Sequence, residues 1–251
     1  MSQGSPSGVQ TVLPPPIPAE EKPDNEKRMI LAEVWDTFTQ DPLGVQFLPG
    51  WFMSLLPRSS PLENHLPWMN FRVIRWLRSY LRPTMRVFEY GSGGSTLFVA
   101  PRVREMTSIE HDTEWHERIG RILGEEGISN CHLRLVPPEP RRSTDPTPYG
   151  PASYTSLTPH AAGLSFERYV RMIEEVPERS LDLVIVDGYA RFSCVAAAIP
   201  KIRPGGFLLF DDTDLKKYRG AVGYLDGYPR TDFLGVTPFQ RNIRQTTIWQ
   251  M

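Results

Sequence analysis

A glycine-rich turn with a glutamate on either side is the strongest chemical feature of the sequence. The turn, GSGGST at residues 91–96, follows the run MRVFEY, whose β-branched and aromatic residues are typical of a buried strand. Glycines at a strand-to-helix turn let a ligand approach the backbone, and free amides at the helix start attract an electron-rich group. Glu89 lies two residues before Gly91, and Glu110 lies nineteen residues after it. We therefore expect a ligand site at this turn.

The two glutamates indicate different parts of that ligand. In a doubly wound sheet, Glu110 would lie beside the tip of the first strand, where it can accept hydrogen bonds from both hydroxyls of a ribose. Glu89, directly before the turn, suits a cationic group such as the amino group and sulfonium of S-adenosylmethionine (SAM), and would repel phosphate. A nicotinamide dinucleotide is the competing ligand, but its G-x-G-x-x-G pattern requires glycine where Thr96 stands. No P-loop lysine follows the turn, which disfavours nucleoside triphosphates.

Three aspartates form a second candidate group. Asp187 follows the apolar run LDLVIV, and Asp211 and Asp212 follow GGFLLF, so all three are expected at the carboxyl edge of one sheet. Carboxylates there could hold a divalent cation of the Mg²⁺ type, which would lower the pKa of a substrate hydroxyl. Alternatively, Asp187 binds cofactor or substrate, and one of the adjacent pair caps the next helix.

Arginine, tyrosine and histidine side chains are expected around the same edge. Arg191 and the pair Tyr218-Arg219 could hold a substrate carboxylate or phosphate, because Arg makes bidentate contacts with such groups. A surface ion pair with the aspartates is the equal alternative. Among the histidines, only His111, beside Glu110, is a site candidate.

Alternating strand and helix patterns would position these residues. Strands are expected at residues 85–90, 105–111, 131–136, 181–188 and 205–212. Helical spacing of apolar residues appears at 28–40, 67–82, 112–127, 164–176 and from Val195 to Ile202. This alternation predicts a parallel sheet with helices on both faces. The final segments DFLGVTPF and QTTIWQM predict an antiparallel hairpin, and one face of the 67–82 helix, Trp68, Phe71, Ile74 and Leu77, is expected to pack.

Proline, with 25 residues in a chain of 251, falls mainly in two clusters. The first, with Ser, Gly and charged residues, predicts a disordered tail over residues 1–26. The second predicts a loop over residues 137–163, which is either a mobile insertion or a lid over the site. Its side chains best able to contact a ligand are Arg141, Arg142, Tyr149 and Tyr154.

Composition narrows the function class. The formal charge of -1 includes no excess of positive charge that would attract nucleic acid or an anionic membrane surface, so neither partner is expected. Cys131 and Cys194 are too few for a disulfide framework, and Cys194 is expected in the core. No run of 18 apolar residues and no signal-peptide pattern occur, so we expect a cytoplasmic protein.

Several of these segments together resemble the class I SAM-dependent methyltransferases, in particular a bacterial branch with the turn FEYGSGGST. The resemblance rests on FEYGSGGSTLFVA, SIEHDTEW, SLDLVIVDGYARF and RPGGFLLFDDTD, and covers roughly residues 65–250 apart from the proline-rich loop. It implies a Rossmann-like, doubly wound α/β sheet of seven strands with the last strand antiparallel. It also implies SAM as cofactor, with Glu89, Gly91 and Gly93 around the methionine part. Glu110 would bind the ribose, and His111 or Asp112 would lie near the adenine.

We therefore interpret the chain as a methyltransferase domain at residues 83–251, preceded by a helical segment at 27–82. It would methylate a small-molecule acceptor through oxygen or nitrogen. The catalytic candidates are Asp187, Asp211 and Arg191, and the metal candidates are Asp187, Asp211 and Asp212. The cofactor-binding candidates are Glu89, Gly91, Ser92, Gly93, Ser95, Thr96, Glu110, His111 and Asp187. Alternatives are a catalytically degenerate SAM-binding interaction module and, less favoured, an NAD-dependent oxidoreductase.

Overall fold

The computed structural model describes residues 42–141 and 149–251. The tail expected at 1–26, the helix expected at 28–40 and the ligand candidate Arg142 lie outside the described residues. None of the helices in the described ranges is long and apolar enough to cross a membrane.

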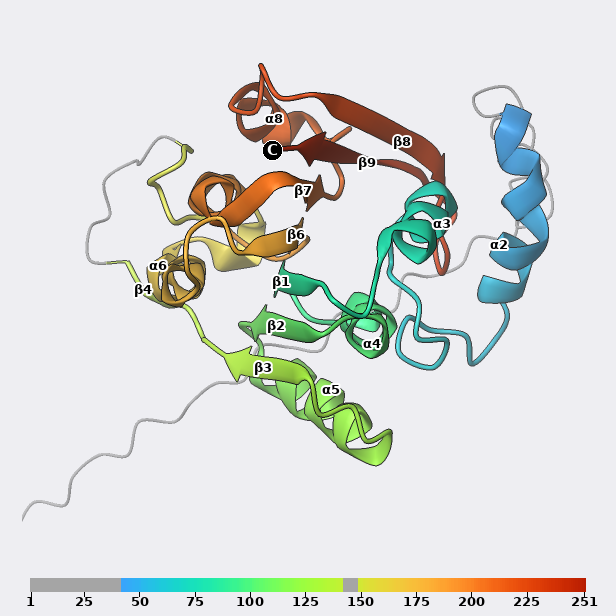
Figure 1. Cartoon of the computed structure of the whole chain (residues 1–251). Helices are drawn as coiled ribbons and strands as arrows, with labels where there is room; N and C mark the ends of the chain where they lie inside the picture. The colour runs from blue at the N-terminus through green and yellow to red at the C-terminus, as the bar shows by residue number, and fades with distance from the viewer. Residues whose placement is uncertain (1–41, 142–148) are drawn as a thin grey trace, which may run out of the picture.

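A seven-stranded sheet runs through the middle of the protein (Figure 1). Its strands are β1 (Arg86–Tyr90), β2 (Glu105–Glu110), β3 (Cys131–Leu135), β6 (Leu181–Val186), β7 (Ile202–Phe210), β8 (Arg230–Val236) and β9 (Ile243–Gln250). Their spatial order is β3-β2-β1-β6-β7-β9-β8. Within this sheet β1, β2, β3, β6 and β7 pair in parallel, whereas β9 is antiparallel to both β7 and β8. The Rossmann-like doubly wound sheet with an antiparallel last strand is confirmed.

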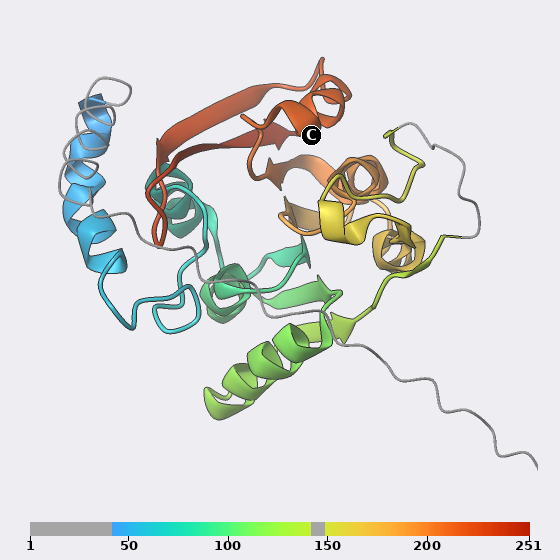
Figure 2. The ribbon, with the colours of Figure 1, turned by 180° about the vertical axis from the view of Figure 1, so that it is seen from behind.

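Helices cover both faces of this sheet, as Figures 1 and 2 show from opposite sides. They are α3 (Phe71–Tyr80), α4 (Gly94–Val99), α5 (Thr113–Glu125), α6 (Glu167–Arg171), α7 (Arg191–Ala198) and α8 (Arg219–Gly223), whereas α2 (Leu48–Ser54) lies apart from the sheet, beyond α3. Successive side chains of the buried strand β6 point to opposite faces of the sheet and pack in the cores on both sides. Val184 joins the core under α6 and α7, and Ile185 joins the core under α3 and α4.

The helix before β1 is shorter than its apolar pattern predicts. Asn70 ends the approach segment in extended conformation, and its side chain accepts a hydrogen bond from the amide of Val73, so the helix begins at Phe71. Ile74 and Leu77 are buried as expected, but Trp68 lies outside the helix and is 50% exposed. The expectation that Trp68 packs with that face is therefore wrong.

The chain around the second proline cluster packs onto α7 where the structure describes it. Two-residue strands β4 (Glu139–Pro140) and β5 (Leu164–Ser165) pair at its base. The amide of Tyr154 donates to Ser193 Oγ at 3.0 Å, and the ring of Tyr149 lies 5.7 Å from that of Phe192. Tyr149 and Tyr154 thus contribute to the core rather than to the cavities described below.

Candidate functional site

The carboxyl ends of the parallel strands meet two adjoining cavities. The larger, about 710 Å³, lies between the glycine turn after β1, the end of β2 and the chain after β6, and we call it the turn cavity. The smaller, about 340 Å³, lies beside Asp187, Asp211 and Asp212, and we call it the aspartate cavity. Trp68 and Asp187 line both cavities. A ligand in one cavity would therefore lie next to a ligand in the other.

Gly91 forms the floor of the turn cavity by close contact between two loops. Its φ of +93° is in the left-handed region, and an added Cβ would come within 2.8 Å of the amide nitrogen of Gly188. Only glycine fits both requirements. The close approach brings the loops after β1 and β6 together and leaves bare backbone facing the cavity.

Glu89 holds the turn from beneath and does not line either cavity. Its carboxylate Oε2 accepts hydrogen bonds from Thr96 Oγ1 at 2.5 Å and from Ser108 Oγ at 2.6 Å. Thr96 Oγ1 in turn accepts the amide of Gly93 at 2.9 Å. Complete burial raises the pKa of Glu89 to about 7, although hydrogen bonds from the side chains of Ser108, Ser95 and Thr96 act to lower it. Thr96 therefore stands where a third glycine would stand because its hydroxyl joins the turn to Glu89.

Glu110 lies at the base of the turn cavity with both oxygens engaged. Its Oε2 accepts from the amide and the hydroxyl of Ser92, at 3.0 and 2.7 Å. Its Oε1 accepts from the amides of His111 and Asp112, at 2.7 and 2.9 Å. Burial raises the pKa of Glu110, but the His111 side chain, the amide of Asp112 and the hydroxyl of Ser92 together bring it below its ordinary value. The carboxylate is thus held ionised and fixed in orientation.

Aromatic side chains form the wall of the turn cavity beyond Glu110. The rings of His111 and Tyr189 lie 4.1 Å apart, and Tyr189 Oη lies 2.6 Å from His160 Nε2. His111 Nδ1 is 2.7 Å from Glu110 Oε1 but outside hydrogen-bonding geometry. Trp115 also lines this cavity, and its Nε1 donates to the carbonyl of Ser92 at 2.8 Å, which ties α5 to the turn.

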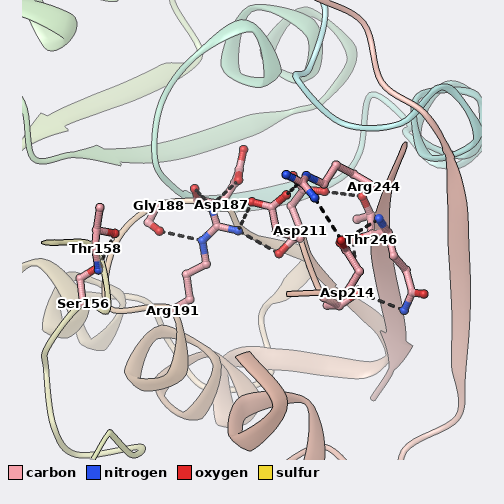
Figure 3. Close-up of polar contacts among 12 residues, drawn as sticks. Ser156, Thr158, Asp187, Gly188, Arg191, Asp211, Asp214, Arg244 and Thr246 are labelled. Carbon is pink, nitrogen blue, oxygen red and sulfur yellow. Dashed lines mark hydrogen bonds and ion pairs between the residues drawn. The ribbon is translucent and has the colours of Figure 1, made fainter. Parts of the chain in front are cut away.

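Arg191 lies among the three aspartates and satisfies all of its donors there (Figure 3). Nε donates to the carbonyl of Gly188 at 2.9 Å, and Nη2 donates to the carbonyl and Oδ1 of Asp187 at 2.8 and 2.9 Å. Nη1 donates to the carbonyl of Asp211 at 2.8 Å and to Oδ2 of Asp212 at 3.3 Å. A guanidinium has five N–H groups, so none remains for a substrate anion. Of the two roles expected for Arg191, the ion pair is the one observed.

The aspartates themselves differ in environment. Their nearest oxygens lie within 4.8 Å of one another. Burial raises the pKa of Asp187 to about 7, opposed by Arg191 and reinforced by Asp212. Burial and the same acidic neighbours raise the pKa of Asp211 well above its ordinary value, and its Oδ1 accepts a short hydrogen bond from Thr246. Asp212 has a φ of +59°, in the left-handed region that aspartate adopts more readily than most residues.

Tyr218 and Arg219, both expected near this edge, differ in their surroundings. Tyr218 is buried beneath the Arg191 guanidinium, whose carbon lies 5.0 Å from the ring centre. Arg219 is exposed at the start of α8. Only Tyr218 therefore contributes to the site, by supporting Arg191.

Several lining residues gave no signal in the sequence. The turn cavity includes Trp115, Arg118 and Tyr189, and the aspartate cavity includes Leu215, Gln240 and Arg244. Tyr189 stands two residues after Asp187, and that spacing could have identified it. Gln240 and Arg244 reach the site only because the β8–β9 hairpin folds back beside β7.

A scan against protein-family models found no matching family, and a search of curated proteins found no match. Solved structures are similar in fold. A candidate O-methyltransferase from Klebsiella pneumoniae aligns with a TM-score of 0.50 and 14% identity, over 84% of this chain and 90% of that one. An rRNA methylase from Streptococcus thermophilus aligns with a TM-score of 0.47 and 15% identity, over 70% and 92%. A candidate methyltransferase from Streptococcus mutans, in complex with SAH, aligns at 0.48 and 13% identity, over 70% and 94%.

This chain has the Rossmann-like fold of methyltransferases, as shown by its strand order, its antiparallel last strand and its similarity in fold to the Klebsiella protein.

Proposed function

We propose that the protein is a SAM-dependent methyltransferase, with SAM in the turn cavity and a small-molecule acceptor in the aspartate cavity. The observation that carries the proposal is that the two cavities share Asp187 and Trp68. Methyl transfer is an in-line displacement between two ligands, and its rate depends on holding them side by side. Adjoining cavities at the ligand-binding edge of a doubly wound sheet meet this requirement.

In this proposal Glu110 binds the ribose of SAM. The Ser92 hydroxyl donates to Glu110 Oε2 at 2.7 Å, as a ribose hydroxyl would, so ribose would replace the serine hydroxyl at that oxygen. Gly91, Ser92 and Gly93 would offer backbone to the methionine part, while Ser95 and Thr96 would act through the turn. His111 and Tyr189 would lie along the adenine.

Asp187 is the proposed proton acceptor. Its Oδ1 is held by Arg191, and its Oδ2 has no hydrogen bond among the described residues. A pKa of about 7 lets a carboxyl accept a proton at neutral pH and release it to water. The acceptor's oxygen or nitrogen would attack the methyl carbon, the carbon–sulfur bond would break with its electron pair on sulfur, and the acceptor's proton would pass to Asp187.

We propose that the transfer uses no divalent cation. The guanidinium of Arg191 already supplies positive charge to Asp187 and Asp212 and occupies the space between them. The Mg²⁺ site expected from the aspartates would require Arg191 to leave. A reducing cytoplasm is the proposed setting, since both cysteines are free thiols.

Calorimetric titration tests this function directly. SAH, the product that SAM leaves after transfer, and NAD⁺ would each be titrated into the purified protein. We expect SAH to bind in the micromolar range and NAD⁺ not to bind. Absence of SAH binding up to millimolar concentration contradicts the proposal, and binding of NAD⁺ instead supports the oxidoreductase alternative. Bound SAM that is never consumed across a broad panel of acceptors would identify the degenerate binding module.

A further inference from the structure

The two arginines of the aspartate cavity differ in how many of their donors are engaged. Arg191 makes five hydrogen bonds with its five N–H groups. Arg244 makes one, from Nη1 to Asp214 Oδ2 at 3.3 Å, and a longer ion pair from Nε to Asp212 Oδ1 at 3.6 Å. Within the described parts of the chain, Arg244 therefore keeps most of its donors for another partner.

Arg244 is also placed and supported as a binding residue. It belongs to β9, opposite Gly235 of β8, and its side chain is 28% exposed where it lines the cavity. Asp212 lies between the two arginines, with one oxygen toward each (Figure 3 shows Arg244 beside Asp214 and Thr246). The β8–β9 pairing fixes the backbone of Arg244, and the contacts with Asp212 and Asp214 position its guanidinium while leaving Nη2 unpaired among the described residues.

Two arginines line the aspartate cavity beside its three aspartates, and a lysine lies close by. Lys217 lies close enough to Arg191 and Arg244 that burial and these cations lower its pKa. Positive groups thus crowd this side of the cavity, which favours a negatively charged ligand.

We propose that Arg244 binds an anionic group of the acceptor, a carboxylate or a phosphate, and that the half-exposed indole of Trp68 packs against the acceptor's apolar part. The inference rests on the proposed function, because it assigns the acceptor to the aspartate cavity. Arg244 Nε is 3.6 Å from Asp212, whose oxygen lies within 4.8 Å of that of Asp187. The anionic group of the acceptor therefore lies only a few bonds from the atom that is methylated.

Four probes that share a phenyl ring separate charge from shape. Benzoate and phenyl phosphate are anionic, benzamide is neutral and benzylamine is cationic. Each would be titrated into the SAH-saturated protein and followed by ligand-observed NMR. We expect one of the anions to bind about tenfold more tightly than benzamide, which is the effect of one hydrogen-bonded charge pair. The stronger anion identifies carboxylate or phosphate as the preferred group.

Variants assign that preference to Arg244. Arg244→Gln should reduce the affinity of the anion to that of benzamide, and Arg244→Lys should keep part of it, since lysine retains the charge but loses the planar fork. Arg230→Gln is the matched control, because Arg230 lies at the far end of the same hairpin and also pairs with an aspartate, Asp232. Thermal melting verifies that each variant is folded.

The outcomes separate this inference from the proposed function. Equal binding of all probes, no binding of any, a preference for benzylamine, or an unchanged preference in Arg244→Gln overturns the inference. Failure of SAH to bind in a separate calorimetric titration overturns the proposed function. The probe titration repeated without SAH then still reports whether Arg244 selects anions.

Discussion

The hydroxyl oxygen of Tyr169 lies 2.1 Å from the position that a Cβ atom at Gly188 would take. Tyr169 is fully buried on α6, and its hydroxyl has no hydrogen-bond partner among the described residues. The same added Cβ would also come within 3.0 Å of the amide nitrogen of Gly91. A tyrosine from one helix and a glycine from the loop after β6 thus fit together beneath the turn cavity.

Gly188→Ala should destabilise the protein by about 2 kcal/mol through overpacking against Tyr169. Tyr169→Phe alone should cost less than about 1 kcal/mol, because the buried hydroxyl that it removes has no partner. The double variant should recover part of the loss caused by Gly188→Ala, since the overlapping oxygen is gone. Urea denaturation of the four proteins measures this coupling, and strictly additive losses would contradict the packing relationship.

Glu89→Gln should flatten the pH dependence of stability. The pKa of Glu89 is about 7 when folded and 4.5 ordinarily, so the folded protein holds this proton more tightly than the unfolded chain. The associated stability is present below pH 4.5 and is lost as the pH rises to about 7, a change of roughly 3 kcal/mol. Denaturation at several pH values measures the slope. Glu178→Gln, at an exposed carboxylate, is the control, and equal slopes for the two variants would argue against a protonated Glu89.

Glu110→Gln should weaken SAH binding at least about tenfold, because the amide loses one charged acceptor for the ribose hydroxyls. Glu114→Gln removes a carboxylate from the rim of the same cavity and should leave the affinity within about twofold. Calorimetric titration of both variants gives the comparison. A similar loss in both would indicate general electrostatics rather than ribose recognition.

Arg191→Gln should destabilise the protein by about 3 to 5 kcal/mol, because its removal leaves Asp187 and Asp212 without their buried partner. Arg219→Gln, an exposed arginine on α8, should change stability by less than about 0.5 kcal/mol. Thermal denaturation distinguishes the two. A near-neutral Arg191→Gln would mean that the aspartates are held apart by other means.

Chelation should leave the wild-type protein unchanged, because Arg191 supplies the positive charge between the aspartates. Melting temperature, and methyl transfer once an acceptor is known, should be equal in EDTA and in Mg²⁺. Arg191→Ala, by contrast, should melt at a higher temperature when Mg²⁺ or Ca²⁺ is added, since the three aspartates then lose the guanidinium that lies among them. A loss of wild-type activity in EDTA would restore the metal hypothesis.

The parts of the molecule that sequence predicts well are those set by local pattern. Apolar runs located the sheet strands to within a few residues, and the spacing from the turn to Glu110 located a carboxylate beneath the turn cavity. The role of Arg191 depends on whether its N–H groups are already hydrogen-bonded within the protein. That can be known only from the folded structure, in which Asp187 and Asp212 surround it. Trp68 was misassigned because helical spacing continues upstream of Asn70, whose capping side chain begins the helix later.

Because β9 is antiparallel to β7 and β8, its N-terminal residues lie at the edge of the sheet where the parallel strands end. The turn that precedes it is anchored to α2, where Trp51 Nε1 donates to the carbonyl of Gln240 at 2.8 Å. The two cavities therefore draw most of their walls from distant stretches of chain. In the proposed function, substitutions in residues 237–244 would alter acceptor preference while the glycine turn stays constant, and exchange of this segment between related chains would offer a route to re-engineer selectivity.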